Sequence, residues 1–180
     1  MKFEKYCKIW GTYSAIIALL YLIYGVLEVI YGVISWWLPW IKLPKIQLGI
    51  ILSISEGKET LYVYIPKIIA DPFAGLILVF MSMIFIKASI NLFKMKIEGW
   101  SFITVGLLLS GALFILNLLI VLANGASVYY PMLWGETPEE SWNILTDEWM
   151  FNPMMTIFVL AIPLIKAYKK KEEFLSKAKT

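Results

Sequence analysis

The sequence contains no histidine and no arginine, and it has a single cysteine, Cys7. Without histidine, the chain lacks the commonest general base and the usual ligand for haem, zinc or copper. Without arginine, it cannot form the bidentate clamp that many proteins use on phosphate or carboxylate groups. One cysteine excludes an intramolecular disulfide and a cysteine cluster. We therefore expect no cofactor, no metal site and no enzymatic activity. The alternative open to these residue types is a Ser–Lys or two-carboxylate site assembled by the fold.

Charge is also scarce, because only 16% of the 180 residues are charged while 60% are hydrophobic. The mean hydropathy is +0.75. A water-soluble domain carries charge on about a quarter of its residues, so much of this surface must face lipid. The length suits one domain. The sequence thus predicts a single integral membrane domain over residues 1–180. The net charge of +3 does not predict nucleic-acid binding, because the lysines follow membrane topology.

Four apolar runs are long enough to cross a membrane, which takes about 20 residues of helix. They cover residues 9–35, 72–93, 99–123 and 152–168, and they leave the outer segments 36–71 and 124–151 between them. The first run is longer than the apolar part of a signal peptide, so we expect it to remain as a helix. The predicted fold is an all-α bundle of four transmembrane helices.

Lysine residues indicate the orientation of these spans. Lysines cluster before the first span, in the 94–98 turn and in the C-terminal tail, whereas the segment 124–151 contains none. Positively charged loops stay on the cytoplasmic side. We therefore expect a multi-pass protein of the cell membrane with both termini in the cytoplasm.

Several short patterns predict where elements begin and break. Asp71-Pro72 and Asn152-Pro153 each combine an N-cap with a first-turn proline. Pro163 should interrupt the fourth span. A capping box at Thr137–Glu140 predicts a short outer helix that ends near Leu145.

The outer side is predicted to form an ordered interfacial layer, because six of the eight tryptophans fall there and tryptophan prefers the headgroup level. Within it, residues 46–65 fit either a short β-hairpin, with strands 46–54 and 61–65, or an interfacial helix followed by an extended stretch. The acidic residues between Glu136 and Glu148 fit a solvated, helix-capping face better than a calcium loop, because the alternating ligand spacing is missing.

Small residues line one stripe of the first span. In lipid, such stripes let helix backbones approach closely, so we expect the first span to pack on a matching face of the third. The predicted seam consists of Gly11, Ala15, Ala18, Gly25 and Gly32 in the first span and Gly106 in the third.

A polar pair stands out within the spans. Glu28 and Asn117 should lie at the same depth in the outer third of the membrane and hydrogen-bond to each other, with Tyr21 and Ser110 on the same faces. An intramembrane carboxylate is a functional hypothesis by default. The alternative is structural, in which Glu28 reaches interfacial water or pairs with a lysine of the outer segment, Lys42, Lys45 or Lys67.

The stretches Tyr64–Gly75, with its Asp-Pro-Phe-Ala-Gly helix start, and Ile97–Gly106, with its Glu-Gly turn, resemble uncharacterised small four-span archaeal membrane proteins. The shared pattern covers roughly residues 60–165. This resemblance implies a four-span membrane protein, and it implies no activity, substrate or site residues.

Together these features predict a non-enzymatic membrane protein that works by packing, as an accessory subunit or a self-associating helix bundle. Its partners would be membrane lipids and other membrane subunits or further copies of itself. Two alternatives stay open. One is a small proton- or cation-coupled carrier or channel that uses Glu28. The other is a protein that binds a lipid or another apolar ligand.

Overall fold

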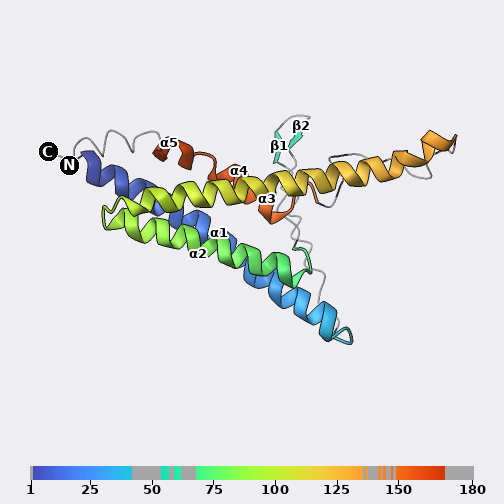
Figure 1. Cartoon of the computed structure of the whole chain (residues 1–180), viewed down its shortest axis with the longest axis horizontal. Coiled ribbons are helices and arrows are strands. Elements are labelled where there is room, and N and C mark those ends of the chain that lie inside the picture. Colours follow the sequence, from blue (N-terminus) through green and yellow to red (C-terminus); the bar gives the residue numbers. More distant parts are fainter. Residues whose placement is uncertain are drawn as a thin grey trace.

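A computed structural model describes residues 2–41, 54–56, 59–61, 68–135, 137, 142, 144, 147 and 149–168. The helices in these residues are α1 (Lys2–Trp37), α2 (Pro72–Phe93), α3 (Glu98–Tyr129), the short 3-10 helix η1 (Tyr130–Trp134), α4 (Pro153–Ala161) and α5 (Leu164–Tyr168). The start of α1, the turn between α2 and α3 and the end of α5 lie at the same end of the molecule (Figure 1). We call this the lysine-bearing end, because Lys5, Lys8, Lys94, Lys96 and Lys166 lie there.

Among the described residues, three helices are long and apolar enough to cross a membrane: α1, α2, and α3 together with η1. The apolar region Pro153–Ala167, made of α4 and α5, is shorter. α2 coincides with the predicted helix 72–93, whereas α1 and α3 extend beyond the predicted spans 9–35 and 99–123. At a rise of 1.5 Å per residue, the 36 residues of α1 measure about 54 Å, so this helix is longer than the roughly 30 Å hydrocarbon layer.

The core lies where α1, α2, α3 and the α4–α5 segment meet. α1 and α2 form the most extensive helix pair, and α3 packs on the other side of α2 (Figure 1). The ring of Tyr21 stacks on that of Phe85 with 5.7 Å between centroids. Trp100 of α3 is buried and stacks on Tyr6 of α1. Ile17, Leu78, Met81, Ile103, Ile157 and Leu164 fill the rest of this core.

Both ends of α2 are capped by hydrogen bonds. The Asp71 carboxylate accepts hydrogen bonds from the backbone N–H groups of Phe73, at 2.8 Å, and Ala74, at 3.2 Å, so the predicted N-cap is confirmed. At the other end, the chain turns through Met95 with φ = 53°. The N–H of Lys96 donates to the carbonyl of Asn91, which is the hydrogen bond of a Schellman motif.

The predicted break at Pro163 is confirmed, because α4 ends at Ala161 and α5 begins at Leu164. Proline has no N–H and interrupts the helical hydrogen bonds around it. Two tyrosines of α1, seven residues apart, donate to carbonyls of this broken segment. The hydroxyl of Tyr13 donates to the carbonyl of Leu160 at 2.5 Å, and that of Tyr6 donates to the carbonyl of Lys166 at 3.1 Å.

The segment for which hairpin and interfacial helix were both open contains two short antiparallel strands, β1 (Ile54–Glu56) and β2 (Glu59–Leu61). Ile54 pairs with Leu61 and Glu56 with Glu59. The hairpin alternative is therefore confirmed where the structure describes it, and Ile54 and Leu61 lie in strands as predicted. The strands also include residues 55–56 and 59–60, which the prediction had left between them. A two-residue connection gives the tightest hairpin, so the pairing begins inside the expected turn. The capping-box helix predicted at 137–145 lies mostly outside the described residues.

The small-residue seams pack, but not against each other as predicted. Gly25 of α1 faces Gly75 and Val79 of α2, and Gly106 of α3 faces the ring of Phe85, also on α2. α2 thus receives both seams, while the contacts between α1 and α3 include larger side chains such as Tyr6 and Trp100. The reason is that α2 has residues of its own, Gly75 and Phe85, that fit against the glycines of α1 and α3.

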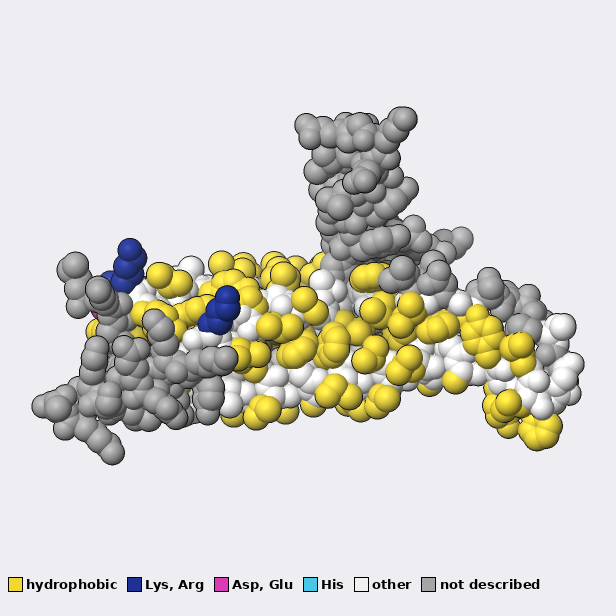
Figure 2. Space-filling view, turned by 90° about the horizontal axis from the view of Figure 1, so that it is seen from above, with side chains coloured by type: hydrophobic (Ala, Val, Ile, Leu, Met, Phe, Trp, Pro, Cys, Tyr) yellow, Lys and Arg dark blue, Asp and Glu magenta, His cyan; other side chains and the backbone are white. Residues whose placement is uncertain are grey.

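The outer surface of the helices is hydrophobic along its length. On the face drawn in Figure 2, hydrophobic side chains follow the whole body and lysines lie only toward the lysine-bearing end. Exposed large residues include Phe80 of α2, Leu108 and Leu116 of α3, and Val159 of α4. Such a belt is what a lipid-facing surface requires.

Candidate functional site

Glu28 is the most unusual polar residue of the helices, because its side chain is 1% exposed. The backbone N–H of Ile69, in the segment that leads into α2, donates to its carboxyl group, and the charge of Asp71 also acts on it. The second carboxyl oxygen, Oε1, is buried and has no hydrogen-bond partner among the residues that the structure describes. Burying a carboxyl oxygen without a hydrogen bond costs free energy. This oxygen can therefore gain stabilisation by binding a proton or by accepting a hydrogen bond.

Close backbone packing holds Glu28 in place. One turn before it, a Cβ added to Gly25 would lie 2.8 Å from the carbonyl oxygen of Gly75 and 2.8 Å from the N of Val79. Gly75, in turn, sits against the backbone of Val29. Only glycine allows this approach of two helices. Glu28 is therefore fixed on a rigid α1–α2 pair.

Deeper in the same pair, three hydroxyl groups are buried among α1, α2 and α3. Tyr21 OH lies near Ser110, but the Ser110 hydroxyl donates to the carbonyl of Gly106 at 2.7 Å. Within the described part of the chain, Tyr21 OH and Ser82 Oγ have no hydrogen-bond partner. Because Ser14 reaches the carbonyl of Phe85, Ser82 lies about one turn further along α2 toward Glu28.

Asn117 bonds to Asn152 rather than to Glu28. The Nδ2 of Asn152 donates to the Oδ1 of Asn117, whose own Nδ2 donates to the carbonyl of Leu113 at 2.9 Å. The Oδ1 of Asn152 accepts from the backbone N–H of Met155 at 2.9 Å, which confirms the predicted N-cap of α4. The two asparagines therefore fasten the beginning of α4 to α3.

The hydrogen bond predicted between Glu28 and Asn117 is thus not formed in the described part of the chain. Figure 1 gives the physical reason: the α1–α2 pair and α3 diverge toward the end opposite the lysines. That the two residues share one depth stays a prediction. The structure brings together Tyr21 and Ser110 from the predicted set, and it leaves Glu28 and Asn117 at separate places.

A third polar cluster joins the outer end of α3 to the segment before α4. The carboxylate of Asp147 accepts hydrogen bonds from Trp142 Nε1, at 2.9 Å, from the backbone N–H of Trp149, at 2.9 Å, and from Asn124 Nδ2, at 3.1 Å. The Trp142 ring lies against Gly125. Partial desolvation raises the pKa of Asp147, but these three donors together outweigh it and leave the pKa below its usual value of 3.8.

Sequence reasoning missed Ser82, Asn152 as the partner of Asn117, and the cluster around Asp147. Ser82 is a single serine within an apolar run, and no spacing to other polar residues marked it as a candidate. Asn152 was predicted as an N-cap, which uses only its side-chain oxygen. Its side-chain NH2 group also needs a hydrogen-bond acceptor, and this need was the available signal for a second partner. No group of three or more acidic, histidine or cysteine side chains in the described residues is arranged to hold a metal ion.

Long apolar helices, a hydrophobic belt and polar groups kept inside define an integral membrane protein of the helical class. The chain belongs to the MJ0565 integral membrane domain family, whose sequence model matches residues 48–172. This confirms the resemblance to archaeal membrane proteins. No curated protein and no solved structure matches the chain. The matched part contains α2 to α5, so Glu28 and Tyr21, on α1, lie outside it.

Proposed function

We propose that the protein is a non-enzymatic multi-pass protein of the cell membrane that works by packing, as an accessory subunit or a self-associating bundle. The observation that carries this proposal is the locked α1–α2 interface. Gly25 and Gly75 bring the two backbones together. Ser14 donates to the carbonyl of Phe85 at 3.0 Å and Ser89 to that of Gly11 at 2.8 Å, so each helix bonds to the backbone of the other. Such an interface suits a rigid scaffold.

The proposed topology has four spans with both termini in the cytoplasm. The start of α1, the end of α5 and the 94–97 turn lie at the same end of the molecule, as an even number of crossings requires (Figure 1). The broken α4–α5 segment completes the fourth crossing with the residues that precede it. Cysteine labelling in a Cys7→Ser background tests this. Lys96→Cys should react only from the cytoplasmic side and Thr137→Cys only from outside. Equal access for both residues from one side would overturn the topology.

Native mass spectrometry of gently solubilised membranes tests the packing role. We expect the full chain to leave the detergent as part of a stable assembly, with itself or with another membrane protein. A monomer, under conditions in which other complexes of the same membrane stay intact, contradicts the proposal.

The second candidate function is proton- or cation-coupled transport through Glu28, and the unpartnered Oε1 of this buried carboxyl group favours it. Flux in proteoliposomes compares Glu28→Gln with Asp71→Asn. The control removes the neighbouring carboxylate but keeps a side chain that can cap α2. A carrier should lose coupled flux in Glu28→Gln alone. Flux that is unchanged in Glu28→Gln removes this residue from any transport role.

A further inference from the structure

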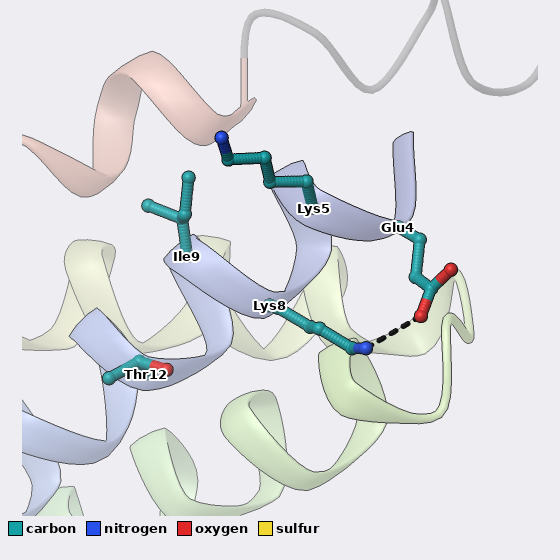
Figure 3. Close-up of a pocket in the computed structure, with 5 residues that line it drawn as sticks. All are labelled: Glu4, Lys5, Lys8, Ile9 and Thr12. Carbon is teal, nitrogen blue, oxygen red and sulfur yellow. Dashed lines mark hydrogen bonds and ion pairs between the residues drawn. The ribbon is translucent and has the colours of Figure 1, made fainter. Parts of the chain in front are cut away.

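The first turns of α1 border a hollow of about 580 Å³ at the lysine-bearing end. Its lining consists of Glu4, Lys5, Lys8, Ile9 and Thr12 (Figure 3). Lys8 Nζ pairs with Glu4 at 2.6 Å. The ammonium group of Lys5 points away from this pair (Figure 3), and it forms no ion pair with any described residue. The hollow therefore offers an uncompensated positive charge beside an apolar side chain.

A second depression lies deeper, between α1 and α2. It has a volume of about 180 Å³ and is lined by Ala15, Ala18, Leu19 and Leu22 of α1 and by Ile86, Ser89 and Ile90 of α2. The alanines make it concave. The only hydroxyl group in its lining, that of Ser89, already donates to the carbonyl of Gly11. This groove therefore presents hydrocarbon alone.

The hollow and the groove lie along one side of α1. Residues spaced alternately three and four apart form a continuous strip on a helix. Here that strip runs through Lys5, Lys8, Thr12, Ala15, Leu19 and Leu22. Leu22 lies 14 residues after Lys8, which corresponds to about 21 Å along the helix. One leaflet contributes about 15 Å of hydrocarbon plus its headgroup layer, so the strip matches a single lipid in length.

We propose that this strip binds one anionic phospholipid of the adjacent leaflet. The phosphate group lies at Lys5 and Lys8, and Thr12 can donate a hydrogen bond to it or to the ester region. One acyl chain lies in the groove between α1 and α2. Charge complementarity selects the anionic headgroup, because lysines at a membrane surface attract anionic lipid. The groove adds the apolar contact that a free phosphate ion cannot make.

Lipid titration of the full chain in detergent, followed by native mass spectrometry, tests this site. The probes are phosphatidylglycerol and phosphatidylcholine with identical acyl chains, and inorganic phosphate as the headgroup alone. Lys5→Gln/Lys8→Gln is compared with Lys94→Gln/Lys96→Gln, which removes the same charge from exposed positions in the α2–α3 turn. We expect phosphatidylglycerol to bind roughly tenfold more weakly to the first variant and to keep its affinity within about twofold in the second. Phosphatidylcholine binding should change in neither.

The groove is tested separately with Ala15→Phe, which fills it, against Leu108→Phe on the exposed face of α3. Ala15→Phe should weaken the binding of both lipids severalfold, and Leu108→Phe should not. Equal loss in the two lysine variants would mean general surface attraction and would overturn the site. Unchanged lipid binding in Ala15→Phe, or displacement of phosphatidylglycerol by inorganic phosphate, would overturn the role of the groove. None of these readouts depends on self-association or on a partner subunit.

Discussion

At the scale of single residues, glycine decides how closely these helices approach. Gly25 and Gly75 face each other across α1 and α2, where an added Cβ would meet backbone atoms. Gly111 of α3 differs, because a Cβ there would meet only the ring of Phe158 at 3.5 Å, an ordinary contact. The two kinds of glycine look alike in the sequence but have opposite requirements.

Gly25→Ala should therefore destabilise the protein by about 1–3 kcal/mol, because overpacking against a backbone cannot be relieved by a side-chain rotation. Gly111→Ala should leave the stability equal or raise it by up to about 1 kcal/mol through helix propensity. Thermal unfolding in detergent micelles measures both. Similar losses in the two variants would show that close approach is not what Gly25 provides.

Met95 is the other residue whose backbone matters, because it adopts the left-handed conformation at the end of α2. An L-residue pays about 1–2 kcal/mol there, and glycine avoids most of this. Met95→Gly should raise the stability by up to about 1 kcal/mol. Lys94→Gly, at an ordinary φ of −79°, serves as the control and should lower it. Thermal unfolding of the two variants distinguishes conformational relief from a general tolerance of glycine in this turn.

At the scale of elements, α1 organises the broken helix at the lysine-bearing end. The carbonyl of Leu160 precedes Pro163 and accepts from Tyr13 instead of from a helical N–H. A polar group left unpaired within a membrane is costly, so the tyrosine compensates for the proline. The same helix carries Tyr21, whose buried hydroxyl has no hydrogen-bond partner in the described residues.

Replacing these two hydroxyls should have opposite effects. Tyr13→Phe should cost about 0.5–1.5 kcal/mol, the range of hydrogen bonds between helices in membranes. Tyr21→Phe removes a buried unpaired group and should be neutral or stabilising by up to about 1 kcal/mol. Unfolding in mixed micelles of increasing sodium dodecyl sulfate content provides the measurement. A loss in Tyr21→Phe equal to that in Tyr13→Phe would mean that the Tyr21 hydroxyl has a partner after all.

At the scale of the whole molecule, the α1–α2 pair forms one arm and α3 forms the other. The two arms pack together at the lysine-bearing end and diverge toward the opposite end (Figure 1). On the α3 arm, Asp147 ties the segment before α4 to Asn124 and Trp142. Since the folded-state pKa of Asp147 is lowered, its contribution to stability is fully present above the usual value of 3.8. That contribution is lost as the pH falls through the lower folded-state pKa.

Asp147→Asn should therefore be less stable than the natural protein at neutral pH, and this difference should shrink once the pH falls below about 4. Comparing the two proteins at each pH cancels the titration of all other groups. Thermal unfolding between pH 7 and pH 3 measures the difference. A difference that is constant over this range would contradict a role for the ionised carboxylate.

Much of the local structure followed from residue types alone. The caps at Asp71 and Asn152 and the break at Pro163 depend on the chemistry of one or two neighbours, so they could be predicted. The strands at 54–56 and 59–61 could be anticipated only as one of two options, because short apolar segments lack a distinctive period. The pairing of Asn117 with Asn152 could not be predicted, since it joins residues 35 positions apart.

By itself, the sequence determined the solvent in which this chain folds, the apolar helices and the points where they begin and break. Hydropathy, proline and capping residues act over a few positions, and in lipid they largely fix where each helix begins and ends. Only the tertiary structure decided which helix each small-residue seam meets and where Glu28 lies relative to Asn117. A stripe of glycines indicates that another helix backbone packs closely against it, but it does not indicate which of the other helices does so. The choice of α2 depends on its own Gly75 and Phe85 and on the total packing of all the helices.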